Sequence, residues 1–326
     1  MKEPVLYIIV PCYNEEEVLL TAADVLHKKL NSLIQNNTIS PESKIVLIDD
    51  GSEDNTWNIA GNICGQFKEF SAIKLSHNSG HQNAVLAGLM SVRDVCDITI
   101  TIDADLQDDI NVMDEMIEEY QKGNDIVYGV RNNRDSDGFL KRFTAQTYYK
   151  FLKFMGVEIV YNHADYRLMD KKALDKLSEF EETNLFLRGL IPLIGLDSSC
   201  VYYSRLPRFA GESKYNVGKM FKLAADGVTS FSIKPLKFIT RLGLLMLFVS
   251  ICFLVYIIIS KFNGNTQTGW SSLMCSIWFL GGLNLVSLGI VGEYVGKIYS
   301  EVKRRPRYII SETKNLNKEN TDDKEF

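Results

Sequence analysis

Five short segments rich in apolar residues are each followed by a polar cluster, and this pattern restricts the fold more than any other feature. The segments cover residues 5–10, 44–50, 71–75, 99–102 and 125–130. They are continuous rather than alternating, which is typical of parallel strands buried on both faces. Helical periodicity lies between them, as in the stripe Val18, Leu19, Ala22, Leu26, Leu30 and Leu33. Strands that alternate with helices predict βαβ units and a mostly parallel sheet of the α/β class.

The polar clusters stand where the predicted strands end. They cover residues 11–15, 49–54, 78–80, 103–105 and 129–131. Any one of them could be an ordinary turn, because Asp-Gly and Asn-Ser-Gly are common turn residues. Ligands of open α/β sheets bind outside the carboxyl ends of the strands. Five clusters at one edge of one sheet therefore predict a shared binding crevice.

Asp103 and Asp105 directly follow the fourth predicted strand. Two carboxylates at a strand end suit a hard divalent cation, which prefers oxygen ligands and often shares them with substrate phosphates. The alternative is an acid-rich loop that caps the helix beginning near Ile110. Taken alone, this stretch leaves both interpretations open.

Composition excludes several classes of protein. The 326 residues carry a net charge of −5, which argues against a nucleic-acid partner. The six cysteines are scattered without a Cys-x-x-Cys pair, so a zinc site is not expected and the thiols should be reduced in a cytoplasmic compartment. The first residues lack the pattern of a signal peptide.

Two uncharged apolar runs, at about residues 242–260 and 273–292, are long enough to span ~30 Å of hydrocarbon. Basic residues flank the pair: Lys234, Lys237 and Arg241 precede it, and Lys297 to Arg307 follow it. The loop between the runs has only Lys261. The positive-inside rule therefore predicts a multi-pass protein of the plasma membrane, with both termini and the soluble part in the cytoplasm.

The polar clusters contain Pro-Cys-Tyr-Asn-Glu (11–15), Asp-Asp-Gly-Ser (49–52) and Asp-Ala-Asp-Leu-Gln (103–107). Together they resemble the motifs of family 2 glycosyltransferases with the GT-A fold. More narrowly, they resemble the branch of dolichyl-phosphate mannosyltransferases and bacterial polyprenyl-phosphate glycosyltransferases. The resemblance covers nearly the whole chain, including the C-terminal hairpin.

The residue patterns and the resemblance together predict four regions. A GT-A catalytic domain is expected over residues 1–214 and amphipathic interfacial helices over 215–237. Two transmembrane helices are expected within 238–296, and a basic cytoplasmic segment with a disordered tail within 297–326.

The resemblance also implies a nucleotide-sugar site. Pro11, Tyr13 and Glu15, with Asp49 or Asp50, are expected to hold the base and the ribose.

For the diphosphate, the resemblance implies that Asp105, with Asp103 and Gln107, binds Mg²⁺ or Mn²⁺ as the cofactor. The cation neutralises charge on the leaving nucleotide. Arg131 is expected to contribute a planar fork that suits phosphate oxygens.

Asp165 is expected to be the carboxylate closest to the transferred sugar, so it joins Asp103 and Asp105 as a catalytic candidate. A helix or turn cap is an equally good interpretation of Asp165. The following segment, 184–190, either shapes the acceptor entrance or forms an amphipathic helix that covers the sheet.

A basic loop at residues 205–215 resembles the mobile loop that covers the active site in this family. Arg205, Arg208 and Lys214 are expected to contact phosphates of the donor or the acceptor, together with Arg131. An ordinary basic surface loop is the alternative. Closure of such a loop would exclude water and protect the sugar from hydrolysis.

These features predict a metal-dependent, inverting hexosyltransferase with a nucleotide-sugar donor, UDP-glucose or UDP-N-acetylglucosamine before GDP-mannose. The expected acceptor is polyprenyl phosphate in the bilayer, and the product a lipid-linked sugar for cell-envelope glycosylation. The alternatives are a glycosyltransferase acting on a glycerolipid and a membrane scaffold that binds nucleotide sugars without turnover. A processive synthase is disfavoured because no tryptophan follows an arginine. Formation of a homo-oligomer stays open.

Overall fold

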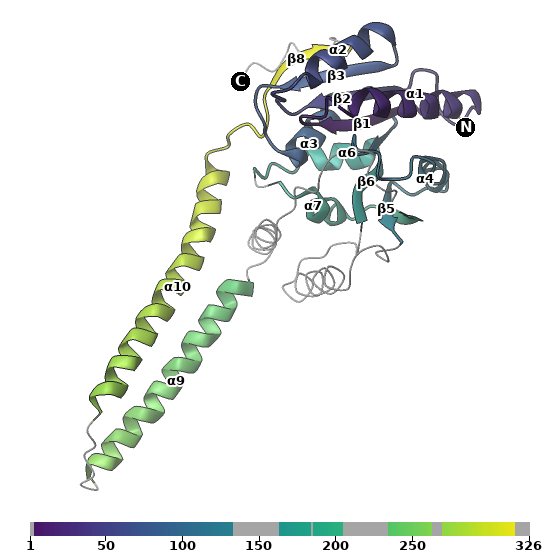
Figure 1. Cartoon of the computed structure of the whole chain (residues 1–326). Helices are drawn as coiled ribbons and strands as arrows, with labels where there is room; N and C mark the ends of the chain where they lie inside the picture. Colours follow the sequence, from purple (N-terminus) through teal and green to yellow (C-terminus); the bar gives the residue numbers. More distant parts are fainter. Residues whose placement is uncertain (1–2, 133–162, 184, 205–233, 263–268, 317–326) are drawn as a thin grey trace. The chain divides into compact units, whose positions relative to one another are not determined.

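The computed structural model describes residues 3–132, 163–183, 185–204, 234–262 and 269–316. They fall into two units, a sheet domain that includes the chain from Arg305 onward, and a helical hairpin (Figure 1). The predicted basic loop with Arg205, Arg208 and Lys214 lies outside the described residues. Most of the predicted interfacial segment, residues 215–233, lies outside them as well.

Within the described residues, one sheet of eight strands has the order β7-β5-β6-β4-β1-β2-β3-β8. The strands are β1 (Leu6–Cys12), β2 (Lys44–Asp49), β3 (Phe70–Leu75), β4 (Ile98–Thr101), β5 (Ile126–Arg131), β6 (His163–Asp170), β7 (Ser198–Tyr203) and β8 (Ile310–Lys314). The five strands expected from the sequence are all confirmed. The pairs β1–β2, β2–β3, β1–β4 and β5–β7 are parallel.

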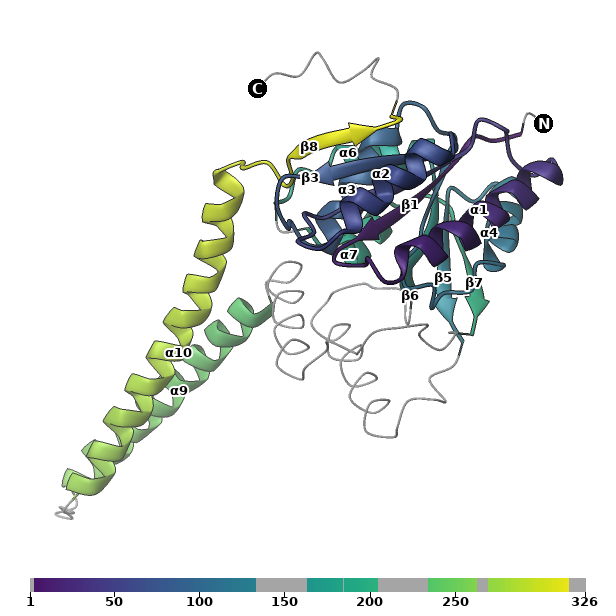
Figure 2. The ribbon, with the colours of Figure 1, turned by 45° about the horizontal axis from the view of Figure 1, so that its top comes forward.

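Helices cover both faces of this sheet (Figures 1 and 2). They are α1 (Leu19–Gln35), α2 (Thr56–Gln66), α3 (His81–Val92), α4 (Val112–Gln121), α6 (Lys171–Ser178) and α7 (Leu187–Leu193). The apolar residues of α1, α2 and α4 pack on one face of the sheet. Those of α3, α6 and α7 pack on the other. Because both faces are covered, the central strands are buried along their length, which explains their continuous apolar sequence.

Strand β6 decides where the site residues meet. It lies between β4 and β5 and is antiparallel to both. Its first residues are therefore at the edge of the sheet where β4 and β5 end. The sequence left Asp165 open as a helix or turn cap; instead it is the third residue of this strand. The antiparallel insertion carries Asp165 to the same edge as Asp103.

The expectation of a disordered tail, which began at Ser311, is wrong for residues 311–316. Strand β8 pairs antiparallel with β3 at the edge of the sheet. Asn315 then donates its side-chain amide to the carbonyls of Cys64 and Phe70, at 2.6 and 3.2 Å. Tyr308 and Leu316 pack against the core on the α3 side. A polar strand is stable here because backbone pairing needs no apolar side chains. Residues 317–326 lie outside the described part.

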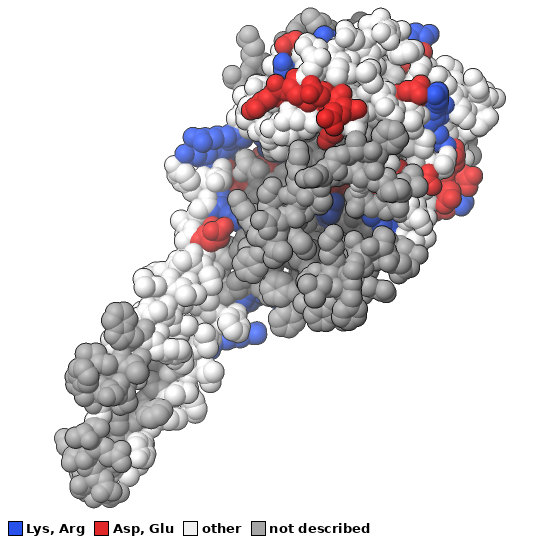
Figure 3. Space-filling view, in the orientation of Figure 1, with Lys and Arg blue, Asp and Glu red and all other residues white. Residues whose placement is uncertain are grey.

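The second unit holds α9 (Lys234–Phe262) and α10 (Trp270–Val302), which lie side by side (Figures 1 and 2). Both are longer than the apolar runs, because helical structure continues into the flanking polar residues. Phe248, Leu280 and Leu285 are among many exposed apolar side chains. Most of the described hairpin surface in Figure 3 lacks charged side chains. Among the described residues, one stretch, Phe279–Val302, is long and apolar enough to cross a membrane.

Candidate active site

The loops after β1 and β2 are joined by hydrogen bonds. The Asn14 amide donates to Ser52 Oγ at 3.0 Å, and the Glu53 amide donates to Asn14 Oδ1 at 2.9 Å. Asn14 has a left-handed φ of 53°, which asparagine tolerates better than most residues. The structure thus brings together the two loops that carry the predicted nucleotide residues.

Pro11 lies near the end of β1, and Tyr13 and Glu15 lie on the loop that follows it. Pro11 is the register partner of Ile48 within the sheet. The side chain of Tyr13 is 38% exposed beside it. The Glu15 amide donates to Thr56 Oγ1 at 2.9 Å, which ties this loop to the start of α2.

Asp49 and Asp50 are both buried but differ in their partners. The two oxygens of Asp50 accept the amides of Ser79 and Gly80, at 2.7 and 3.0 Å. Asp49 Oδ1 accepts the Ser52 amide at 3.2 Å, while its Oδ2 is buried without a hydrogen-bond partner among the described residues. Burial raises the pKa of Asp49. Buried polar atoms are almost always paired in proteins, so Asp49 Oδ2 is an acceptor that lacks its donor.

Gly51 is required by the turn that presents these two carboxylates. Its φ of +66° lies in the left-handed region that favours glycine. A Cβ at this position would lie 2.5 Å from the carbonyl carbon of His77. Any side chain would therefore push the turn away from the segment that Asp50 binds.

The loop after β4 carries the predicted metal ligands. Asp103 has a side chain that is 39% exposed, whereas Gln107 is 6% exposed. The Gln107 amide donates to Asp105 Oδ1 at 3.3 Å. Between them, Leu106 has a φ of 50°, and such strained residues gather at functional sites.

The electrostatics of this loop favour a cation. Loss of hydration raises the pKa of Asp103; His81 opposes this rise, whereas the neighbouring carboxylates of Asp165, Asp108 and Asp105 add to it. A positive charge would relieve that crowding. No group of three or more His, Cys, Asp and Glu side chains arranged for a metal ion occurs among the described residues. Two carboxylates nevertheless fit Mg²⁺, which completes its octahedral shell with water and substrate phosphates.

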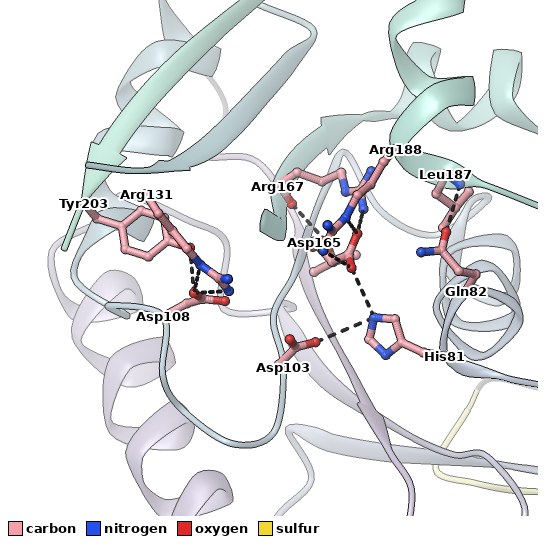
Figure 4. Close-up of polar contacts among 11 residues, drawn as sticks. His81, Gln82, Asp103, Asp108, Arg131, Asp165, Arg167, Leu187, Arg188 and Tyr203 are labelled. Carbon is pink, nitrogen blue, oxygen red and sulfur yellow. Dashed lines mark hydrogen bonds and ion pairs between the residues drawn. The ribbon is translucent and has the colours of Figure 1, made fainter. Parts of the chain in front are cut away.

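Arg131 has a partner that the sequence analysis did not anticipate. Its Nη2 donates to Asp108 Oδ1 at 2.9 Å, and the Tyr203 hydroxyl donates to the same oxygen at 2.6 Å (Figure 4). The carboxylate of Asp108 is 2% exposed. The ends of β5 and β7 thereby hold the loop that carries Asp105 and Gln107. The predicted contact of Arg131 with phosphate stays a prediction.

Asp165 is held by two arginines (Figure 4). Arg188 donates Nε to Oδ1 at 3.1 Å and Nη2 to Oδ2 at 2.9 Å. Arg167 Nη2 donates to Oδ1 at 2.7 Å. Burial alone would raise the pKa of Asp165, but Arg188, His81 and Arg167 outweigh it and hold that pKa well below its usual range. Asp165 is therefore a permanent carboxylate.

His81 stands between the two carboxylates, at the start of α3. Its Nε2 lies 3.7 Å from Asp103 Oδ1 and 3.6 Å from Asp165 Oδ2. Burial would lower the pKa of His81, but the nearby carboxylates of Asp165 and Asp103 raise it. The Asn-Ser-Gly cluster that precedes His81 was predicted from the sequence to lie at the site, but the histidine was not. Its place directly after a strand-end cluster was the available signal.

Comparison with known proteins decides the family. The Glycosyl transferase family 2 model matches residues 7–178, more than half of the chain. This chain belongs to glycosyltransferase family 2. The GtrB C-terminal hairpin model matches residues 234–298 of this glycosyltransferase. The hairpin match and the exposed apolar helices indicate association with a membrane.

Relatives of this glycosyltransferase match over nearly their whole length. The uncharacterized glycosyltransferase YkoT of Bacillus subtilis is 47% identical over 308 residues, covering 94% of this chain and 91% of the relative. The SfII prophage-derived bactoprenol glucosyl transferase of Shigella flexneri is 38% identical, covering 94% and 97%. The uncharacterized glycosyltransferase sll0501 of Synechocystis is 35% identical, covering 94% and 95%. The resemblance and the GT-A fold expected from the sequence are confirmed.

Proposed function

We propose that this glycosyltransferase transfers a hexose from a nucleotide sugar to polyprenyl phosphate at a membrane surface. The observation that carries the proposal is the presence, in one chain, of a carboxylate-lined sheet edge and a GtrB-type hairpin. The similarity to a bactoprenol glucosyl transferase over 94% of this chain supports the same acceptor. UDP-glucose is the favoured donor on this ground, followed by UDP-N-acetylglucosamine.

For the nucleotide, the two aspartates after β2 take separate roles. Asp49 Oδ2 lacks a donor among the described residues, so we assign Asp49 to a polar hydrogen of the base. Asp50 is saturated by two backbone amides and positions the turn before α3. Tyr13, which is partly exposed, would pack on the base or the ribose, beside Pro11 and Glu15.

For the diphosphate, Asp103 and Asp105 would hold Mg²⁺ or Mn²⁺, with Gln107 nearby. The donor set and the crowding of carboxylates around Asp103 support this assignment. When bound, the cation neutralises negative charge on the leaving nucleoside diphosphate.

Asp165 orients the reacting groups in this proposal and does not accept a proton. A general base works best when its pKa lies near the operating pH. The pKa of Asp165 is held well below the usual range of a carboxyl group, so Asp165 is poorly suited to that role. The acceptor phosphate is already anionic, so a single in-line displacement with inversion requires no strong base. The carboxylate can hold a sugar hydroxyl or stabilise positive charge at the anomeric carbon.

The membrane arrangement is part of the proposal. Two transmembrane helices in the hairpin are inferred from its two apolar runs, and a cytoplasmic sheet domain is inferred from the basic residues that flank them. Arg131 and the loop residues Arg205, Arg208 and Lys214 remain predicted phosphate contacts. The lipid-linked sugar would then serve cell-envelope glycosylation.

An acceptor comparison tests the proposal. Purified full-length protein is incubated with Mn²⁺ and radiolabelled nucleotide sugars, with either undecaprenyl phosphate or diacylglycerol as acceptor. Label in undecaprenyl phosphate, preferentially from one donor, supports the proposal. Label only in diacylglycerol would favour the glycerolipid enzyme. Binding of donor without transfer to any lipid would favour the scaffold.

A further inference from the structure

One short segment, the turn at residues 79–80 with the first two residues of α3, contacts both the donor side and the far side of the candidate active site. On the donor side, the amides of Ser79 and Gly80 donate to the carboxylate of Asp50. His81 follows and faces Asp103 and Asp165. The turn is thereby anchored to the loop that carries the predicted nucleotide residues.

Gln82, the second residue of α3, makes a contact with α7 that no sequence motif indicates. Its Oε1 accepts the backbone amide of Leu187 at 2.8 Å, across 105 residues of sequence (Figure 4). Leu187 is the first residue of α7, and the first four amides of a helix have no acceptor within it. The N-cap residue Phe186 provides no side-chain hydrogen bond. Gln82 therefore caps α7 from another helix.

The cap is not easily replaced by water. Leu187 is 1% exposed, so water has little access to its amide. A buried amide that loses its acceptor destabilises the fold, because no other hydrogen bond compensates for the loss of hydration. The start of α7 is consequently held at one position relative to α3. A loss of the acceptor at Gln82 would allow this first turn to shift.

The next residue of α7 is Arg188, which binds both oxygens of Asp165. A paired guanidinium and carboxylate transmit displacement, because the two hydrogen bonds fix both distance and plane. Any shift of the first turn of α7 would therefore move or rotate Asp165. The chain of contacts runs from Gln82 through Leu187 and Arg188 to the carboxylate.

We propose that Gln82 is a positioning residue for sugar transfer: by capping α7 from α3, it sets the orientation of the Arg188–Asp165 pair relative to the donor side. The inference rests on the proposed transferase function. It makes Gln82 important for the chemical step and unimportant for nucleotide affinity, since the Asp49 and Asp50 turn keeps its own hydrogen bonds.

The test compares two variants of the full-length protein. Gln82→Met has nearly the same length but no acceptor oxygen, whereas Gln82→Glu keeps an acceptor for the Leu187 amide. We expect Gln82→Met to lower kcat about tenfold, since small misplacements of reacting groups cost rates of this order. UDP affinity should stay within about twofold, and Gln82→Glu should retain kcat within about threefold. Gln121→Met, at the exposed end of α4, is the matched control.

Hydrogen exchange supplies a readout that does not depend on turnover. The amides of residues 187–190 should exchange faster in Gln82→Met than in the wild type and in Gln82→Glu. In a double-mutant cycle, Gln82→Met should add little to Arg188→Lys, because both act through the same pair.

Several results would overturn the inference. The first is unchanged hydrogen exchange at residues 187–190 in Gln82→Met. The second is an equal loss of kcat in Gln82→Met and Gln82→Glu. The third is a fall in UDP affinity that matches the fall in kcat. If the wild type transfers no sugar at all, the proposed function fails, while the exchange measurement still decides whether Gln82 holds α7.

Discussion

Arg188 and Asp165 form a two-point contact, with Nε–Oδ1 and Nη2–Oδ2 distances of 3.1 and 2.9 Å. The pair joins α7 to the first residues of β6, and His81 links it to Asp103. Because Asp165 stays ionised, its function depends on its direction more than on its proton affinity. We therefore expect activity to be sensitive to the geometry around this carboxylate.

Substitution of Arg188 by Lys tests that sensitivity. Lysine keeps the positive charge but cannot form the planar two-point contact. We expect kcat to fall by about 10- to 100-fold with UDP affinity unchanged. Arg93→Lys, which alters a surface ion pair with Asp94, should leave both quantities unchanged. Steady-state transfer and UDP titration measure them; equal losses in kcat and UDP affinity would contradict a purely orienting role.

Substitution of Tyr203 by Phe tests the anchor of the predicted metal loop. The variant removes the hydroxyl that donates to the buried carboxylate of Asp108. Hydrogen bonds to charged groups contribute about 1.5–3 kcal/mol, so the free energy of unfolding should fall by that amount. Binding of Mn²⁺ in the presence of UDP, followed by electron paramagnetic resonance, should weaken. Tyr202→Phe, at the exposed neighbouring position, is the control; a matching loss in that variant would exclude a specific anchor.

The pKa of Asp170 leads to a prediction of how the stability of the fold depends on pH. Burial raises the pKa of this α6 N-cap residue to about 6. A raised carboxyl pKa means that its contribution to stability is fully present below the unfolded pKa of about 3.9 and is lost as pH rises through 6. Asn caps helices equally well and does not titrate.

Asp170→Asn should therefore be more stable than the wild type at pH 8, by up to about 3 kcal/mol. The difference should disappear near pH 4. Thermal unfolding of both proteins across this range is the measurement. Parallel curves at all pH values would show that Asp170 has an ordinary pKa.

Substitution of Asn315 tests how strongly the C-terminal segment is held at the edge of the sheet. Its amide serves two main-chain carbonyls, of Cys64 and Phe70, so Asn315→Ala should lower the free energy of unfolding by about 1–3 kcal/mol. The φ of 54° adds a small penalty for alanine. Asn315→Gly removes that penalty and isolates the hydrogen bonds. Urea unfolding followed by circular dichroism gives the values; full stability of both variants would mean that this contact is dispensable.

The parallel part of the fold follows from the sequence because buried strands have a simple signature. The segments before Asp49 and Asp103 are continuous and apolar, and both form strands as expected. Strand β8 was missed because its sequence, Ile-Ser-Glu-Thr-Lys, has no apolar face to reveal it. Its pairing depends on the free edge of β3, which a local pattern cannot show.

The residues of the candidate site likewise fall into those that the sequence could place and those that it could not. Asp103, Asp105 and Asp49 stand at predictable strand ends, so their place could be inferred. The partners of Asp165 and Arg131 could not, because they depend on the antiparallel insertion of β6 and on the pairing of β5 with β7. The contact of Gln82 could not be predicted for the same reason, since its partner Leu187 is 105 residues away in the sequence.

We propose that the sheet edge at Asp105 supports the transfer of a sugar to polyprenyl phosphate. The most direct measurement is formation of radiolabelled lipid from UDP-glucose and undecaprenyl phosphate by purified full-length protein, compared with Asp105→Asn. We expect metal-dependent label with the wild type and a loss of at least about 100-fold in the variant, which stays folded. Equal labelling by both proteins would contradict a role for Asp105 in transfer. No label with any nucleotide sugar in the presence of Mg²⁺ or Mn²⁺ would contradict the proposed transferase function.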